Sequence, residues 1–310
     1  MTGVEILPFC PLCHGNEKVF LPVPRVRIGD QYFSQHLSEF KLVKCLSCGL
    51  KYVNPRPAPS LLLGFYEQAG YSSHDPNCGE GFHRERLNLI AKYSKGFNLL
   101  DLGCGGGNFL REAQRSGYFV TGVEPSSQGR NSALKLGCNI QSGLTPVIQS
   151  GQVFDVVSAW HVMEHVSNID KTMKEVHSIL GKDGIFIVAV PNVRSARSML
   201  FDFISPTILE GDERYRAFPI HLYGFSRSTL FRLMEKNGFS PIKTTTQYFA
   251  LDEMFASIRS QRAKEGSHCS TDVKSGSRFF DGRLFKMFIK SIFFGLLFGE
   301  SLVMIGRKND

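Results

Sequence analysis

The glycine-rich stretch Leu99–Leu110 is the part of the chain best suited to hold a small ligand. Its glycines, Gly103, Gly105 and Gly107, occupy alternate positions between a predicted strand and a predicted helix. Glycine permits a tight turn and lets a ligand contact the backbone directly, and a helix N-terminus behind such a loop favours a negative group. The carboxyl end of a strand is also where α/β folds bind their ligands. We therefore expect a ligand site in this loop.

Two acidic side chains flank the loop. Asp101 precedes it, and Glu124 follows the next predicted strand, 119–123. A carboxylate at Glu124 can accept hydrogen bonds from both hydroxyls of a ribose. Dinucleotide sites usually carry G-x-G-x-x-G, whereas Asn108 leaves the shorter spacing G-x-G-x-G here. The pattern favours a methyltransferase site over a dinucleotide site, and a tight turn without a ligand is the remaining alternative.

Four cysteines near the N-terminus form two C-x-x-C pairs, Cys10 with Cys13 and Cys45 with Cys48. Each such turn aims two thiolates at one point, and four thiolates make a closed tetrahedral zinc site of the structural kind. In a cytosolic chain, paired cysteines indicate metal more than disulfides; a redox pair is the alternative. The prediction is a structural Zn²⁺ in a ribbon that, with its linker, spans residues 1–59.

Strands and helices alternate from residue 97 onward, which predicts an α/β domain with a mostly parallel sheet and helices on both faces. This domain would span residues 60–310. A loose insertion and an apolar helix are expected within 259–298, and a closing pair of strands is expected at 239–246 and 301–306. The proline-rich run 54–59 is expected to be a linker, because prolines cannot continue a helix or a central strand.

Ordered landmarks extend the argument beyond the glycine loop. They are DLGCG at 101–105, FDVV at 154–157 leading into HVMEHV at 161–166, LGKDG at 180–184, VPN at 190–192 and PIHLYGFS at 219–226. The stretch from about Tyr66 to Phe239 resembles the class I S-adenosylmethionine-dependent methyltransferases. It is most similar to the branch with ubiquinone-pathway O-methyltransferases and sugar methyltransferases.

The resemblance implies a Rossmann-like sheet of seven strands and a set of cofactor-binding residues. That set is Asp101, Gly103, Gly105, Gly107, Glu124 and Trp160, and it would hold S-adenosyl-L-methionine. Relatives often have Gly-Asp after the third strand, where the acid meets the adenine amine. This chain has Gly143-Leu144, so adenine recognition would use other groups.

Methyl transfer to oxygen or carbon also needs a base. His161, His165 and His221 are the candidates, since histidine titrates near neutrality, and Tyr223 lies beside His221 in the loop where relatives place substrate-facing residues. A packed surface loop is the alternative for His221 and Tyr223. Tyr66 is a candidate for a lid over the cofactor, as is Tyr71.

The cluster His161, Glu164 and His165 has two interpretations. Quinone O-methyltransferases associate a Glu-x-x-Glu-His cluster with a divalent metal, and here histidine replaces the first glutamate. Imidazole and carboxylate are both ordinary metal ligands. The alternative, which we favour, is that Glu164 and His165 orient their loop and cap the following helix.

The charge and composition limit the choice of partner. The chain has 310 residues, 42% of them hydrophobic and 21% charged, with a formal net charge of +8, which fits a folded protein with a basic surface. Residues 259–290 carry much of that excess. The absence of a signal peptide and of a run of about 20 apolar residues predicts a cytoplasmic protein. The basic, aromatic segment 279–298 could contact a membrane peripherally or pack on the sheet.

The leading hypothesis is an enzyme that methylates an oxygen or carbon of a small molecule or glycan precursor. An RNA base methyltransferase is the second hypothesis, because a cysteine module precedes the domain and the charge is basic; the His221 loop argues against it. The third hypothesis is a non-catalytic cofactor-binding protein.

Overall fold

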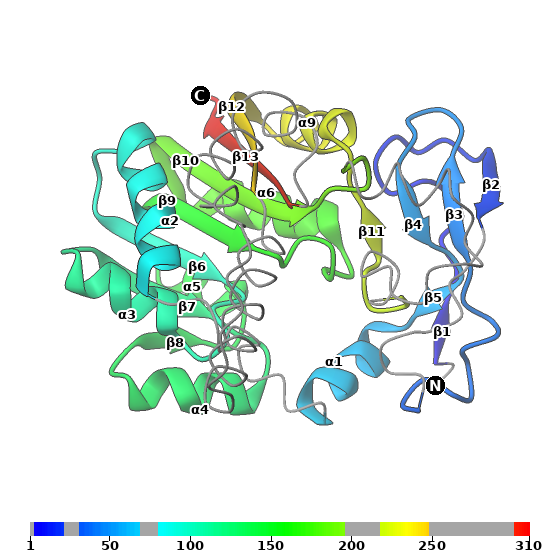
Figure 1. The fold of residues 1–310 in the computed structure, drawn as a ribbon, viewed down its shortest axis with the longest axis horizontal. Helices are drawn as coiled ribbons and strands as arrows, with labels where there is room; N and C mark the ends of the chain where they lie inside the picture. The colour runs from blue at the N-terminus through cyan, green and yellow to red at the C-terminus, as the bar shows by residue number, and fades with distance from the viewer. Residues whose placement is uncertain (1–2, 22–30, 69–79, 196–217, 248–300) are drawn as a thin grey trace, which may run out of the picture.

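The computed structural model describes residues 3–21, 31–68, 80–195, 218–247 and 301–310. A large sheet flanked by helices lies beside a smaller β-rich ribbon, and helix α1 (Pro59–Gln68) follows the ribbon in the chain (Figure 1). This confirms the expected α/β architecture.

The large sheet has seven strands in the order β12-β13-β10-β9-β6-β7-β8. They are β6 (Asn98–Leu102), β7 (Phe119–Val123), β8 (Asn139–Gln141), β9 (Phe154–Trp160), β10 (Leu180–Pro191), β12 (Phe239–Gln247) and β13 (Ser301–Lys308). Strand β13 pairs antiparallel with both β10 and β12, and the pairs from β10 to β8 are parallel. The Rossmann-like fold and the expected closing pair of strands are therefore confirmed, and the structure shows that the pair is antiparallel.

The helices of this domain are α2 (Glu80–Tyr93), α3 (Asn108–Arg115), α4 (Ser127–Lys135), α5 (Leu144–Gln149), α6 (Ile169–Ile179) and α9 (Arg227–Lys236). Side chains of Ser126, Asn168 and Ser226 accept backbone hydrogen bonds at the starts of α4, α6 and α9, which satisfies N–H groups that have no partner within a helix. Helix α5 was not predicted, because it has six residues and contains Pro146. The expected insertion and helix at 259–298 lie outside the described residues.

The ribbon is built on a four-stranded antiparallel sheet, β11-β4-β3-β2. Its strands are β2 (Lys18–Leu21), β3 (Leu42–Cys45), β4 (Lys51–Val53) and β11 (Tyr223–Gly224). Strand β11 comes from a distant part of the chain, after the large sheet's β10. The ribbon sheet is thus completed by the loop that carries His221.

The run expected to be a linker is an ordered part of the ribbon. Strand β5 (Arg56–Pro57) pairs with β1 (Val4–Glu5), and the buried side chain of Asn54 donates to the carbonyl of Leu7 and accepts from its N–H. The prolines do not prevent this, because a two-residue edge strand needs few backbone donors.

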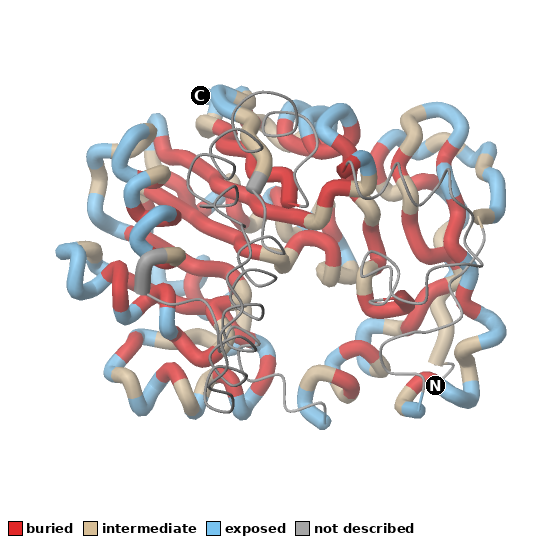
Figure 2. Tube along the Cα trace, viewed as in Figure 1, coloured by how far each residue is buried: buried red, intermediate tan, exposed pale blue. Residues whose placement is uncertain are grey.

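The core is continuous between the two parts. One cluster of buried side chains joins the ribbon's Phe33, Phe40 and Tyr52 to Val157, Phe186 and Phe225 of the larger domain. Figure 2 shows buried residues along the central strands and through the ribbon. Among the described residues, no helix is long and apolar enough to cross a membrane.

Candidate functional site

The glycine loop connects β6 to α3 and folds back on β7. Gly103 and Cys104 donate their N–H groups to the carbonyl of Val123, at 2.7 and 3.1 Å. Gly103, Gly105 and Gly107 all have positive φ angles, the region that glycine alone enters without strain. At Gly103 a Cβ atom would lie 2.4 Å from Val162 Cγ2, and at Gly107 it would lie 2.9 Å from Ala133 Cβ. Backbone conformation therefore favours glycine at all three positions, and close packing also requires it at Gly103 and Gly107.

Glu124 holds the loop in place from the end of β7. Its carboxylate accepts hydrogen bonds from the N–H of Gly105 at 2.9 Å and from the N–H of Ser126 at 2.8 Å. Each oxygen keeps a further lone pair that can accept from a ribose hydroxyl. The side chain is buried, which raises its pKa, and the two N–H groups oppose that rise.

Asp101 lies on the neighbouring strand, buried beneath the loop. Ser158, its register partner on β9, donates its hydroxyl to the Asp101 carboxylate at 2.6 Å. Burial raises the pKa of Asp101 to about 7, while the hydrogen bond from Ser158 and the charge of Arg86 lower it. A buried carboxylate of this kind is suited to a cationic ligand group.

Aromatic rings and a buried arginine lie beside this carboxylate. The guanidinium of Arg86, on α2, lies 4.1 Å from the ring centre of Phe82 and 4.5 Å from that of Trp160. The Nε1 of Trp160 is buried without a hydrogen-bond partner in the described part of the chain. S-adenosylmethionine fits this set of groups: the indole N–H of Trp160 as an unused donor, the buried acid Asp101, Glu124 as an acceptor for the ribose, and the tight glycine loop.

The four paired cysteines are brought together as predicted. Their sulfurs lie within 4.8 Å of one another, with Cys10 and Cys48 at 3.6 Å and Cys13 and Cys45 at 3.5 Å. A zinc ion bonded to four thiolates at about 2.3 Å sets neighbouring sulfurs about 3.8 Å apart, whereas a disulfide needs about 2.05 Å. The cluster therefore fits a closed, structural zinc site.

A second cluster follows the carboxyl end of β9. Ligand atoms of Glu164, His165 and His221 lie within 4.8 Å of one another, and the rings of His165 and His221 have centres 4.6 Å apart. The Nδ1 of His165 lies 3.0 Å from the Tyr66 hydroxyl and 3.1 Å from the Ile220 carbonyl. Because a carbonyl only accepts, Nδ1 carries a proton if it bonds Ile220, and Nε2 then keeps its lone pair.

Of the three candidate histidines, His161 is placed differently. Its Nδ1 lies 3.4 Å from Glu164 Oε1, and its Nε2 lies 3.2 Å from the Ser301 hydroxyl. His221 rather than His161 therefore completes the group with Glu164 and His165. The structure places Tyr66 against His165, while Tyr71 lies outside the described residues.

Electrostatics fix the protonation states of this cluster. Burial lowers the pKa of His165 and lowers that of His221 to about 3, and the charge of Glu164 opposes both shifts. Burial alone would raise the pKa of Glu164, but the nearby imidazoles, first that of His161 with its Nδ1 at 3.4 Å, lower it. These directions favour an ionised carboxylate at Glu164 and neutral imidazoles at His165 and His221 near neutral pH.

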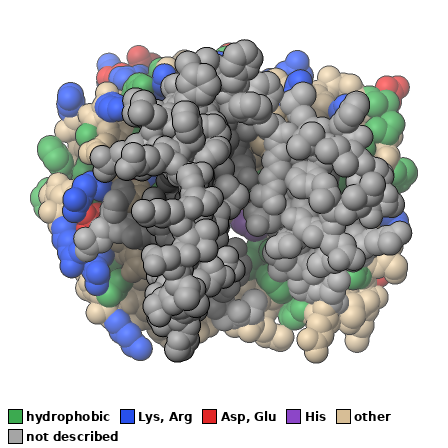
Figure 3. All heavy atoms as spheres, in the orientation of Figure 1, with side chains coloured by type: hydrophobic (Ala, Val, Ile, Leu, Met, Phe, Trp, Pro, Cys, Tyr) green, Lys and Arg blue, Asp and Glu red, His purple; other side chains and the backbone are tan. Residues whose placement is uncertain are grey.

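A small pocket, partly open to solvent, adjoins His221. Its walls come from the end of β10, the His221 loop and the ribbon, whose Leu42 and Lys51 line it. Histidine surface is visible in the middle of the face drawn in Figure 3, between the large sheet and the ribbon. The pocket therefore brings His221 next to side chains of both the large domain and the ribbon.

Three features of the site were not predicted. Arg56, Arg86 and Ser158 are all buried. Ser158 could have been noticed as a polar residue in the apolar strand FDVVSAW, and Arg56 as an arginine between two prolines. The position of Arg86 depends on how α2 packs, for which the sequence carries no comparable signal.

Comparisons with known proteins agree with this geometry. A family model described as a methyltransferase domain matches residues 77–244. A ubiquinone biosynthesis O-methyltransferase of Azorhizobium caulinodans is 27% identical over 165 residues, 48% of this chain and 65% of that protein. One from Pelagibacter ubique is 30% identical over 118 residues, 36% of this chain and 48% of that protein. The matches thus span about half to two thirds of these relatives.

Solved structures share the fold. A methyltransferase of Thermotoga maritima, titled a possible histamine N-methyltransferase, is 19% identical with a TM-score of 0.50 and covers 80% of this chain and 100% of its own. Magnesium protoporphyrin IX methyltransferase of Synechocystis is 12% identical with a TM-score of 0.50, covering 81% and 100%. With its glycine loop, acids and seven-stranded sheet in place, the chain belongs to the methyltransferase domain family.

Proposed function

We propose that this protein transfers a methyl group from S-adenosylmethionine to an oxygen or carbon of a small molecule or glycan precursor. One observation carries the proposal. The loop after β6 is held by Glu124, and the loop after the adjacent strand β9 bears Glu164 and His165, beside which His221 lies. Cofactor and acceptor would thus meet at one edge of the sheet, as reaction between two bound molecules requires.

Each group near the glycine loop has a proposed role. Glu124 would accept hydrogen bonds from the ribose hydroxyls, and Asp101 would face the cationic amino group of the methionine portion. Arg86, buried beside Asp101 and Trp160, would balance the carboxylate of the same portion. S-adenosylmethionine supplies an activated methyl group when bound, so the protein's own task is alignment and exclusion of water.

His221 is the proposed base for the acceptor. Its imidazole is neutral at pH 7 and can take a proton, although a pKa of about 3 makes it weak on its own. Glu164 raises the pKa of both His221 and His165, so its carboxylate would stabilise the charge after proton transfer. Glu164, His165 and His221 would therefore act together in the proton transfer.

A divalent metal at this cluster is the alternative role for the same residues. Neutral imidazoles and an ionised carboxylate are the protonation states that bind a metal, and the electrostatics favour them here. The ligands would be Glu164, His165 and His221, in place of the set with His161. The bound metal would supply Lewis acidity toward an acceptor oxygen.

The test is release of S-adenosylhomocysteine from S-adenosylmethionine with a panel of acceptors. Dihydroxyaromatic quinone precursors come first, because the relatives are named for ubiquinone O-methylation; sugar nucleotides and RNA follow. We expect turnover with a small molecule and its loss in His221→Gln. Turnover confined to RNA would replace the proposed acceptor class, and cofactor binding without any turnover would favour the non-catalytic hypothesis.

A further inference from the structure

The strand that follows His221 belongs to the ribbon sheet. Strand β11 pairs antiparallel with β4, with Tyr223 opposite Tyr52 and Gly224 opposite Lys51. The N–H of Val53 also donates to the carbonyl of Leu222 at 3.0 Å. On its other side, the N–H of Leu222 donates to the carbonyl of Glu164 at 2.7 Å. The ribbon therefore supplies one of the two backbone anchors next to His221.

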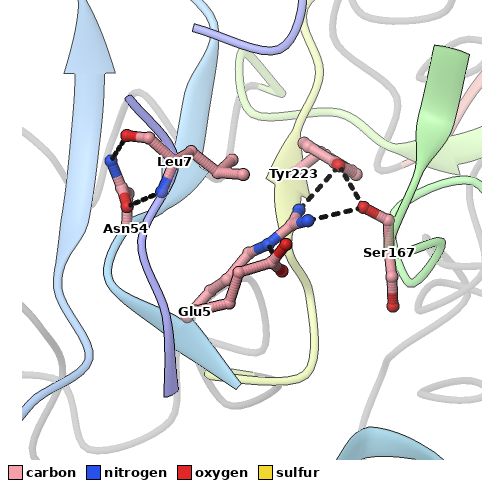
Figure 4. Close-up of polar contacts among 6 residues, drawn as sticks. Glu5, Leu7, Asn54, Ser167 and Tyr223 are labelled. Carbon is pink, nitrogen blue, oxygen red and sulfur yellow. Dashed lines mark hydrogen bonds and ion pairs between the residues drawn. The ribbon is translucent and has the colours of Figure 1, made fainter. Parts of the chain in front are cut away.

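A buried arginine of the ribbon fixes the same strand through side chains (Figure 4). Arg56 donates from Nη1 to the Tyr223 hydroxyl at 2.9 Å, from Nη2 to the Ser167 carbonyl at 2.7 Å, and from Nε to Glu5 at 2.8 Å. The Tyr223 hydroxyl donates in turn to the Ser167 carbonyl at 3.2 Å. Because Ser167 closely follows His165 in sequence, Arg56 ties together the two loops that bear the imidazoles.

Close packing leaves this strand little freedom. A Cβ atom at Gly224 would lie 2.8 Å from Val193 Cγ1 and 3.3 Å from Lys51 Cβ, so β11 is pressed between the end of β10 and the ribbon. The hydrogen bonds that occupy the Tyr223 hydroxyl make that residue a support for the loop rather than a proton donor.

We propose that the zinc ribbon is an integral wall of the acceptor site, and that Arg56 is the positioning residue that couples it to His221. The ribbon contributes Leu42 and Lys51 to the pocket. The cysteine cluster includes Cys45 at the end of β3, β3 pairs with β4, and β4 in turn orders β11. The identification of the pocket as the acceptor site rests on the proposed function; the coupling itself does not. Loss of zinc or of Arg56 therefore disturbs the acceptor side and leaves the glycine loop intact.

Hydrogen exchange measured by mass spectrometry on the full-length, zinc-loaded protein tests this coupling without any acceptor. The variants are Arg56→Met, Arg56→Lys and Tyr223→Phe. The control is Arg307→Met, because the Arg307 side chain is partly exposed and its ion pair with Asp183 is long, at 4.0 Å. We expect exchange in peptides covering 218–226 to rise at least tenfold in Arg56→Met and less in the other two. Peptides covering 98–124 and S-adenosylhomocysteine affinity should stay within twofold of the unmutated protein.

Removal of zinc with a chelator should produce the same local change as Arg56→Met. Once an acceptor is identified, Arg56→Lys should raise the KM for that acceptor while the KM for S-adenosylmethionine stays unchanged. The proposal is overturned if exchange at 218–226 is unaltered in Arg56→Met, or if every peptide exchanges faster to the same extent. Failure of the unmutated protein to bind the cofactor would instead count against the proposed function.

Discussion

Replacing Asp101 with asparagine should make the folded protein more stable while weakening its hold on the cofactor. Burial raises the pKa of this carboxyl from its ordinary 3.8 to about 7, so ionising it costs the folded state free energy. At about 1.4 kcal/mol per pKa unit, that difference corresponds to at most roughly 4 kcal/mol. Asparagine keeps an oxygen that can accept from Ser158 and carries no charge.

The pH dependence has a definite sign. The folded state holds the Asp101 proton more tightly than the unfolded chain, so this group's destabilisation is fully present above pH 7. It decreases as the pH falls through 7 and is absent near the unfolded pKa of about 4. Asp101→Asn should therefore melt a few degrees above the unmutated protein at pH 8, with the gap narrowing at pH 5.5.

Thermal unfolding from pH 5.5 to 8.5, with cofactor titration of the same samples, measures both effects. We expect at least a tenfold loss of S-adenosylmethionine affinity, because a charge-assisted contact to the amino group is removed. A melting-temperature gap that does not change with pH would refute the reasoning about ionisation. Unaltered affinity would refute the role given to Asp101.

Three further predictions concern other parts of the site. Gly103→Ala should destabilise the protein by about 1–3 kcal/mol more than Gly151→Ala in denaturant unfolding, since both glycines have positive φ but only Gly103 faces Val162; equal losses would contradict the packing argument. Cys45→Ser should abolish the zinc found by elemental analysis, and Cys138→Ser should retain it; zinc in both would place the metal elsewhere. Glu164→Gln should lower kcat by about 10²–10⁴-fold with an unchanged cofactor KM, and an unaltered kcat would exclude the cluster from proton transfer.

The sheet and the cofactor loop could be read from the sequence because their signals are local. Apolar strands alternate with helices, and the three glycines stand at alternate positions in one short turn where each has a positive φ angle. The cysteine pairs are similarly explicit, since their ligand spacing is a property of two short turns. Helix α5 was not predicted, because its six residues, which include Pro146, are too few to show the spacing of apolar residues that marks a helix.

The acceptor side was harder to predict because its contacts join distant segments. The sequence grouped His161 with Glu164 and His165, which are neighbours in the chain, whereas folding brings His221 to them. Arg56 was assigned to a linker because its prolines are a local signal, and its partners Tyr223 and Ser167 are far away in sequence. Domain boundaries drawn along the chain likewise separated β11 from the ribbon sheet that it completes.

Calorimetric titration with S-adenosylmethionine and S-adenosylhomocysteine tests the central claim most directly. The samples are the zinc-loaded protein, Glu124→Ala, and Glu85→Ala as an exposed glutamate control. The account predicts low-micromolar binding to the unmutated protein and to Glu85→Ala, and none to Glu124→Ala, which loses the ribose acceptor and the bond to Gly105. Absence of binding by the folded, unmutated protein would contradict it.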